Sequence, residues 1–226
     1  MTITDLNQKR EREIERVRRL YDYEDKYRAE GFELIAGVDE VGRGSLAGEL
    51  IVSALILPHD LFIAHLNDSK KLTHRRREIL YYEIVEKALA VSTVRSTVEE
   101  IDRLNVYRAT LDAMFRAVHA LPIKPDFVLT DAMKLYFGDD IGSLSIIKGD
   151  AKSATIAAAS IVAKVTRDRM TEEWDALYPQ YDFAHNRGYG TKKHLDALRK
   201  YGASPIHRRS YEPVKSMASE QMRIEF

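Results

Sequence analysis

The segment Gly37-Val38-Asp39-Glu40-Val41-Gly42-Arg43-Gly44 joins the end of an apolar run, two adjacent carboxylates and a glycine-rich turn that carries a cation. The apolar residues 34–38 predict a β-strand that ends at Asp39 and Glu40. Acids at a strand end, followed by a flexible cationic loop, are compatible with a metal site to which a phosphate backbone can bind closely. An ordinary strand end with a solvated Asp-Glu turn is the competing interpretation. Partner carboxylates elsewhere in the chain decide between the two.

Composition limits the class of protein. The 226 residues suffice for one generous domain or for a domain with appendages, and 45% hydrophobic residues are ample for a core. No apolar run approaches the roughly 20 residues that cross a membrane, and the first ten residues contain no apolar signal-peptide segment. The absence of cysteine excludes disulfides, thiolate nucleophiles and Cys-type metal sites. We therefore expect a cytoplasmic protein without a membrane partner. At a formal net charge of +0, a nucleic-acid partner would need local basic patches.

The first 31 residues are dense in charge, and apolar residues recur among them at helical spacing. They predict one long amphipathic helix or a helical pair that ends near Gly31. Acids match the basic residues in number, which favours a solvated helical extension over a dedicated nucleic-acid arm.

The remaining pattern is α/β, with a mixed sheet. Strands are expected at 34–38, 50–57, 91–98, 127–131 and 144–147. Helices are expected from an N-cap at Thr73 to about 90, as one stretch over 98–121, and over 151–177, where alanines and Ser160 allow close packing on the sheet. We expect a helical N-terminal extension (1–31), an α/β core (32–178) and a C-terminal helical segment (179–226).

Two further acids follow predicted strands in the same way. Asp131 ends one strand and Asp150 follows the next. Neighbouring strands lie roughly 4.8 Å apart, so carboxylates at their ends can share one ion. Oxygen ligands of this kind suit Mg²⁺ or Mn²⁺, and two such ions can assist phosphoryl transfer. Asp168 is the alternative to Asp150, but it lies inside a helix beside two arginines, where a structural ion pair is the better interpretation. Because side chains alternate along a strand, Asp39 and Glu40 can both reach the site only if the chain bends there.

Taken together, the motifs of this chain resemble those of bacterial ribonuclease HII, the type-2 ribonuclease H. The resemblance extends from about residue 33 to about residue 215. It rests on 37–44, on Asp-Ser-Lys-Lys-Leu at 68–72, on Asp131, on Lys-Gly-Asp at 148–150, on 156–164 with 166–168, and on Gly-Tyr-Gly-Thr at 188–191 followed by His194. The chain departs from the usual family pattern at Val41, Ser45, Glu49 and Ala132, and these departures leave every expected acid in place.

The resemblance implies an RNase H-like mixed five-stranded sheet flanked by helices. It implies that Asp39, Glu40, Asp131 and Asp150 are the catalytic metal ligands, holding two Mg²⁺ or Mn²⁺ ions. The implied substrates are RNA–DNA hybrids and DNA duplexes with embedded ribonucleotides, nicked on the 5′ side of the ribonucleotide to leave 3′-hydroxyl and 5′-phosphate ends. The implied role is ribonucleotide removal from DNA, in repair and replication.

Recognition of a single ribose requires sensing one 2′-hydroxyl. The resemblance assigns this to the backbone of Gly42, Arg43 and Gly44, with Tyr189 packed against the sugar. The cation excess of residues 181–215 supports backbone-phosphate contacts. Individual phosphate candidates are Lys70, Lys71, Arg187 and Lys192.

Two alternatives remain open: a related enzyme restricted to long hybrids, and a nucleic-acid-binding module that has lost catalysis. The intact Gly-Arg-Gly loop with Tyr189 argues against the first, and four retained acids argue against the second. The histidines at 185, 194 and 207 lack metal-binding spacing and are interpreted as structural or phosphate-proximal. We expect a monomer, and a sliding-clamp peptide is not evident in the C-terminal residues 221–226.

Overall fold

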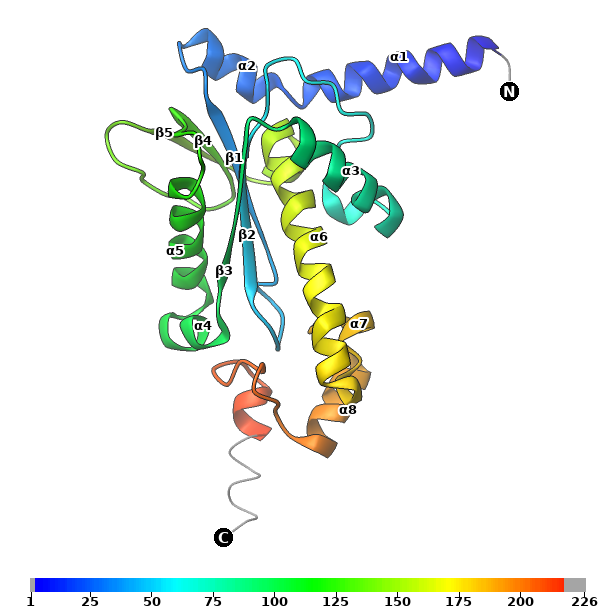
Figure 1. Cartoon of the computed structure of the whole chain (residues 1–226), viewed down its shortest axis with the longest axis vertical. Coiled ribbons are helices and arrows are strands. Elements are labelled where there is room, and N and C mark those ends of the chain that lie inside the picture. Colours follow the sequence, from blue (N-terminus) through cyan, green and yellow to red (C-terminus); the bar gives the residue numbers. More distant parts are fainter. Residues whose placement is uncertain (1–2, 218–226) are drawn as a thin grey trace. The chain divides into compact units, whose positions relative to one another are not determined.

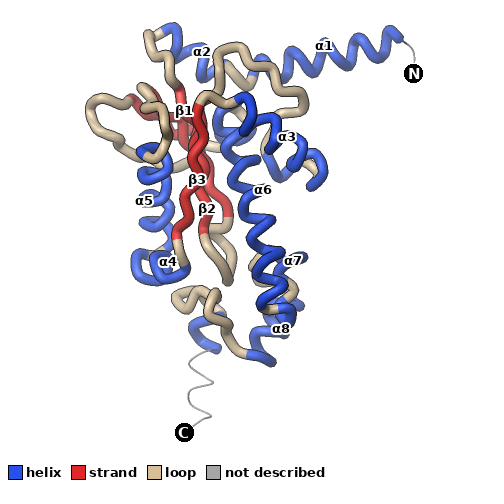
Figure 2. The backbone as a smooth tube through the Cα atoms, in the orientation of Figure 1, coloured by secondary structure: helices blue, strands red, loops and turns tan. Residues whose placement is uncertain are grey.

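The computed structural model describes residues 3–217 of the chain, so the C-terminal residues 221–226 considered for a clamp peptide lie outside it. Five strands form one mixed sheet in the order β3-β2-β1-β4-β5 (Figures 1 and 2). They are β1 (Ile35–Val41), β2 (Leu50–Ile56), β3 (Ala90–Ser96), β4 (Phe127–Asp131) and β5 (Gly142–Ile146). β4 pairs in parallel with both β1 and β5. The expected five-stranded sheet flanked by helices is confirmed.

Helices precede, separate and follow these strands. They are α1 (Ile3–Arg19), α2 (Asp22–Ala29), α3 (His74–Lys87), α4 (Val98–Leu104), α5 (Val106–His119), α6 (Ala154–Leu177), α7 (Phe183–Asn186) and α8 (Lys192–Tyr201). Short 3-10 turns are η1 (Ser69–Lys71), η2 (Gly149–Ala151) and η3 (Pro179–Tyr181). No helix in the described part of the chain is long and apolar enough to span a bilayer.

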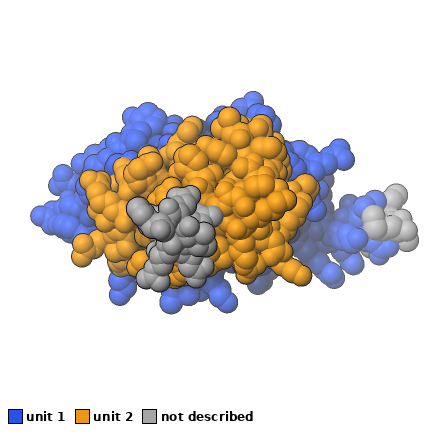
Figure 3. Space-filling view, turned by 90° about the horizontal axis from the view of Figure 1, so that it is seen from below, with its two compact units in different colours: residues 1–40, 52–94, 114–165 blue, residues 41–51, 95–113, 166–226 orange. Residues whose placement is uncertain are grey.

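The chain forms two compact units, coloured separately in Figure 3. Unit 1 comprises Met1–Glu40, Val52–Val94 and Met114–Val165, and unit 2 comprises Val41–Ile51, Arg95–Ala113 and Thr166–Phe226. Five elements, β1, β2, β3, α5 and α6, run from one unit into the other. These units do not follow the boundaries expected at residues 31 and 178, and the three-part domain division stays a prediction.

In unit 1 the start of α6 packs closely against the sheet. Its alanines belong to a buried cluster with β2, α3 and the end of α1. At Gly37 of β1, a Cβ atom would lie 2.2 Å from the backbone carbon of Thr155. Only glycine therefore allows β1 and α6 to approach this closely. The close approach places the first turns of α6 beside the part of β1 that carries Asp39.

The N-terminal extension is the predicted helical pair, and α2 is an integral part of unit 1. Tyr27 stacks on Phe127 of β4 with ring centroids 3.8 Å apart. Glu24 is fully buried, and its Oε1 accepts hydrogen bonds from the Ser153 hydroxyl (2.7 Å), the Thr155 N–H (2.9 Å) and the Thr155 hydroxyl (2.7 Å). Burial raises the pKa of Glu24. A carboxylate of the extension therefore caps the N-terminus of α6, the end of the helix dipole that attracts negative charge.

The single helix expected over 98–121 is wrong, because Asn105 divides it into α4 and α5. Asn105 combines a positive φ (+65°) with an extended ψ (160°), and its Oδ1 accepts hydrogen bonds from the N–H groups of Tyr107 and Arg108. This backbone conformation cannot continue a helix, and asparagine is a strong N-cap for the helix that follows. The apolar spacing continues across the break, so periodicity alone conceals it.

Replacing Glu24 by alanine should lower the free energy of unfolding by about 2–3 kcal/mol, because it leaves three buried donors without their acceptor. Urea unfolding followed by circular dichroism measures the change. Glu30→Ala is the matched control, since Glu30 is exposed on the same extension and should shift stability by less than about 0.5 kcal/mol. Equal effects of the two substitutions would contradict the capping role.

Candidate metal centre

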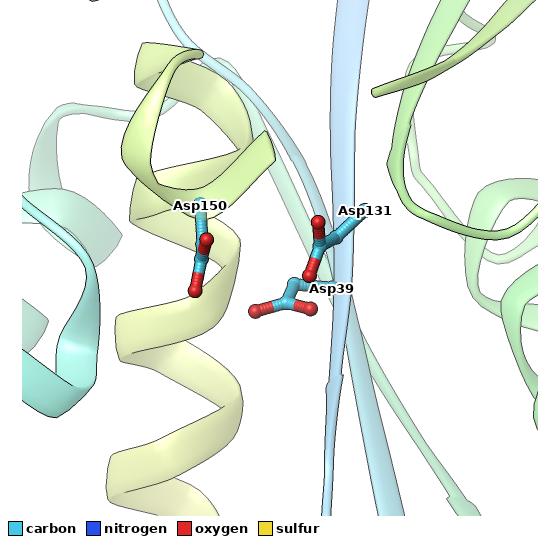
Figure 4. Close-up of side chains that lie close together, drawn as sticks. All are labelled: Asp39, Asp131 and Asp150. Atoms are coloured by element: carbon cyan, nitrogen blue, oxygen red, sulfur yellow. The ribbon is translucent and has the colours of Figure 1, made fainter. Parts of the chain in front are cut away.

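Three aspartates of unit 1 meet where the sheet faces the start of α6. Asp39 is the fifth residue of β1, Asp131 is the last residue of β4, and Asp150 lies in η2. The parallel register aligns Val38 with Thr130, which brings the two strand aspartates next to each other. One oxygen from each of the three carboxylates lies within 4.8 Å of the others. Figure 4 shows Asp39 and Asp131 projecting from their strands and Asp150 reaching toward them from the turn.

Asp150 reaches this cluster by a route that differs from the expected strand end. β5 ends at Ile146, and Lys148 then adopts a left-handed conformation (φ +58°) that turns the chain into η2. The N–H of Gly149 donates a 2.7 Å hydrogen bond to Asp131 Oδ1. This bond ties the turn that carries Asp150 to the aspartate of β4.

Burial and mutual repulsion make the cluster electrostatically unfavourable without a cation. Burial, with the nearby charges of Glu40 and Asp131, raises the pKa of Asp39 well above its ordinary value. Burial, with the charges of Asp68 and Asp131, also raises the pKa of Asp150, while Lys70, whose Nζ lies 3.5 Å from Asp150 Oδ2, opposes that shift. A bound divalent cation would reverse both effects, because it favours the charged carboxylates.

The donor set fits a hard divalent ion. All three ligand candidates are carboxylates, and Mg²⁺ prefers oxygen ligands at about 2.1 Å, so that opposite ligands lie about 4.2 Å apart. The carboxylate oxygens of the three aspartates lie within 4.8 Å of one another, which is close to this separation between opposite ligands. Among the residues that the structure describes, the cluster offers no histidine or thiolate that would favour zinc.

Glu40, the fourth predicted ligand, is not part of this cluster. β1 is a continuous strand through Asp39 and Glu40 to Val41, and adjacent side chains along a strand point to opposite faces. The N–H of Glu40 instead donates a 2.8 Å hydrogen bond to Asp39 Oδ1. A ligand role for Glu40 stays a prediction.

Two serines that the sequence pattern did not single out for the site support Asp39. The hydroxyl of Ser160 on α6 hydrogen-bonds to the Asp39 carboxylate, and Ser69 Oγ of η1 lies 2.8 Å from Ser160 Oγ. Both serines are buried. Ser160 was expected only to allow close packing. A hydroxyl within an otherwise apolar alanine-rich helix face was the available signal for a polar partner.

In unit 2, two buried arginines hold the loop that contains Gly42, Arg43 and Gly44. Arg167 donates hydrogen bonds to the carbonyls of Glu49 and Ala47 and to the Ser45 hydroxyl. Arg208 donates to the carbonyls of Gly48 and Arg43. Both guanidinium groups are fully buried, and burial lowers the pKa of Arg167 to about 10.

The same loop requires glycine at position 42. Its φ is +96°, and a Cβ atom there would lie 2.4 Å from Arg167 Nε. Either feature alone disfavours any other residue. The approach of a buried guanidinium therefore explains the first glycine of the Gly-Arg-Gly sequence.

Tyr189 lies beside this loop within unit 2. A Cβ atom on Gly44 would be 3.8 Å from the Tyr189 ring, and the Arg167 guanidinium lies 5.8 Å from the ring centroid. The residue is 40% exposed, so part of its surface is accessible to solvent.

A pair of buried histidines holds the backbone of Tyr189. The N–H of Ser204 donates to His207 Nδ1 (2.9 Å), which places the His207 proton on Nε2. His207 Nε2 therefore donates to His194 Nε2, with the two nitrogens 3.0 Å apart, and His194 Nδ1 in turn donates to the Tyr189 carbonyl at 2.9 Å. Burial lowers the pKa of both rings, for His207 to about 3. The two histidines are thus neutral structural groups.

The four predicted phosphate contacts have different surroundings. Arg187 is engaged inside unit 2, where it donates to the Thr171 hydroxyl (2.6 Å) and lies 3.8 Å from Asp168. Asp168 accordingly has a cationic partner, although this partner is not one of its two neighbours in sequence. Lys70 contacts Asp150, whereas Lys71 and Lys192 are exposed and form no ion pair with any residue in the described range.

Comparison with known proteins identifies the family. The family model for ribonuclease HII matches residues 36–214. The ribonuclease HII of Enterococcus faecalis is 50% identical over 208 residues, which cover 92% of this chain and 81% of that protein. The crystal structure of ribonuclease H2 from Pyrococcus horikoshii OT3 matches with a TM-score of 0.71 and 26% identity, covering 84% of this chain and 98% of the other.

A more distant structure shows the same fold. Bst-RNase HIII, crystallised in complex with Mn²⁺, matches with a TM-score of 0.59 at 16% identity, covering 84% of this chain and 70% of the other. The family model covers most of the chain, and the bacterial relative is similar over nearly all of it. The chain therefore belongs to the ribonuclease HII family.

Proposed function

We propose that the protein hydrolyses the RNA strand of RNA–DNA hybrids and nicks duplex DNA on the 5′ side of embedded ribonucleotides, leaving 3′-hydroxyl and 5′-phosphate ends. Its family makes it a metal-dependent ribonuclease H. The observation that carries the proposal is the cluster of Asp39, Asp131 and Asp150, because this set of carboxylates suits divalent ions that act on a phosphodiester. We further propose that it acts as a cytoplasmic monomer in ribonucleotide removal from DNA.

The proposed cofactors are two Mg²⁺ or Mn²⁺ ions, held by the three aspartates with Glu40 as a further ligand. When bound, such ions activate water and stabilise charge on the attacking and leaving oxygens. The residues of the chain hold the ligands in place: the Ser160 hydroxyl orients Asp39, and the Gly149 N–H orients Asp131. Hydrogen bonds to outer oxygens of this kind commonly tune metal sites.

We propose that the loop of Gly42, Arg43 and Gly44 senses the 2′-hydroxyl and that Tyr189 packs against the sugar. Two features support this assignment. The two buried arginines draw carbonyls of the loop inward, and the N–H of Gly44 donates to no described residue. The partly exposed Tyr189 lies with its ring beside Gly44. A backbone donor next to an aromatic ring suits recognition of a sugar.

The direct test is incubation of a DNA duplex that contains one ribonucleotide with the protein and Mg²⁺ or Mn²⁺. Denaturing electrophoresis should show one nick 5′ of the ribonucleotide. Asp131→Asn should reduce the rate by at least about 10³-fold, because it removes a central ligand charge, and should leave duplex binding largely intact. Asp140→Asn, which alters an exposed acid paired with Lys124, should retain the wild-type rate. Cleavage of hybrids alone would favour the hybrid-restricted alternative, and binding without any cleavage would favour the non-catalytic one.

Replacing Tyr189 by alanine should slow nicking at a single ribonucleotide about 10- to 100-fold, since aromatic stacking contributes roughly 1–3 kcal/mol. Long hybrids offer many alternative sites and should be affected less. Initial rates on both substrates measure the difference, with Tyr189→Phe retaining most activity. Tyr201→Ala, another exposed tyrosine of unit 2, is the control. A uniform small effect of Tyr189→Ala on both substrates would reduce this residue to a packing role.

A further inference from the structure

A cationic recess of about 430 Å³ lies in unit 1 beside the metal centre. Ala151 and Lys152, which directly follow Asp150, form part of its lining. Lys71 forms another part, and it directly follows Lys70, whose Nζ contacts Asp150. Two lining residues, Ala151 and Lys71, are therefore the sequence neighbours of Asp150 and Lys70, whose side chains contact each other.

The N-terminal extension provides the other side of this recess. Arg16 and Arg19 at the end of α1 line it, together with Asp22 and Tyr23 at the start of α2. The extension is fixed to unit 1 by the buried Glu24 and by the stacking of Tyr27 on Phe127. Its contribution to the recess thus comes from a firmly packed part of the fold.

The charges of the recess favour an anion. Four cationic side chains line it, against the single acid Asp22. Arg16 is bound to Glu13, and Arg19 pairs with the exposed Glu15. The remaining cations, Lys71 and Lys152, are exposed and form no ion pair with any described residue.

A neutral donor adds to these cations. Asn67 also lines the recess, and its Oδ1 accepts a hydrogen bond from the N–H of Asp68, so that its amide N–H groups remain for another partner. Two unpaired lysines and an amide donor around one small space are typical of phosphate binding.

We propose that this recess binds a phosphodiester group of the nucleic-acid substrate and that Arg19 brings the N-terminal extension into that contact. The inference rests on the proposed function, because it extends the substrate's path from the metal centre into the recess. It also separates the two neighbouring lysines: Lys70 is engaged with Asp150, and Lys71 serves the phosphate. A volume of 430 Å³ is large enough for a phosphate with its sugar.

The test is binding of a fluorescein-labelled ribonucleotide-containing duplex, measured by anisotropy in EDTA over a series of KCl concentrations. Each phosphate contact contributes about 0.9 to the slope of log K against log salt. Lys71→Gln/Lys152→Gln should therefore make the slope shallower by about 1.8 and weaken binding at moderate salt by at least tenfold.

Arg19→Gln and Arg18→Gln form a matched pair for the extension. Both arginines are exposed on the last turn of α1, but only Arg19 lines the recess. Arg19→Gln should make the salt slope shallower, and Arg18→Gln should not. An unchanged slope and affinity in the double lysine variant would overturn the inference while leaving the proposed function intact. A wild-type protein that neither binds nor nicks the duplex would overturn the proposed function itself.

Discussion

The mutual repulsion of Asp39, Asp131 and Asp150 is the constraint on which the structure of unit 1 depends. Their carboxylates are held within 4.8 Å, and two of them have raised pKa values. The fold resists this repulsion through parallel pairing of β1 with β4, the Gly149–Asp131 hydrogen bond and the Ser160 hydroxyl on Asp39. Carboxylates that the fold holds close together despite their mutual repulsion are expected where a cation binds.

The position of α6 links this cluster to the N-terminal extension. Gly37 lets α6 approach β1, which brings Ser160 to Asp39, and Glu24 of α2 caps the same helix. In unit 2, buried arginines hold the backbone of the Gly-Arg-Gly loop, and a neutral histidine pair holds the backbone of Tyr189. Buried charged groups are costly, so the use of two buried arginines to hold a single loop indicates that its conformation matters.

Sequence reasoning predicted most of the sheet and two of the clustered acids by position, because apolar runs that end in aspartate carry a strong local signal. It also placed Asp150 near the others, but not on a 3-10 turn, since the left-handed Lys148 that makes the turn is not readable from its residue type. The cap at Glu24 and the break at Asn105 were missed for a related reason. Each depends on the hydrogen bonds of one polar residue, and such bonds leave no periodic signal in the sequence. Nothing in the sequence distinguishes Glu24 from the other acids of the N-terminal extension.

Calorimetric titration of the metal-free protein with Mn²⁺ tests the central claim, that Asp39, Asp131 and Asp150 together hold divalent cations. The account predicts binding by the wild type and a loss of at least roughly tenfold in affinity for Asp39→Asn and Asp150→Asn alike. It also predicts weaker binding on acidification, since ligands with raised pKa values are protonated as the pH falls. Wild-type affinity in either folded variant would contradict it.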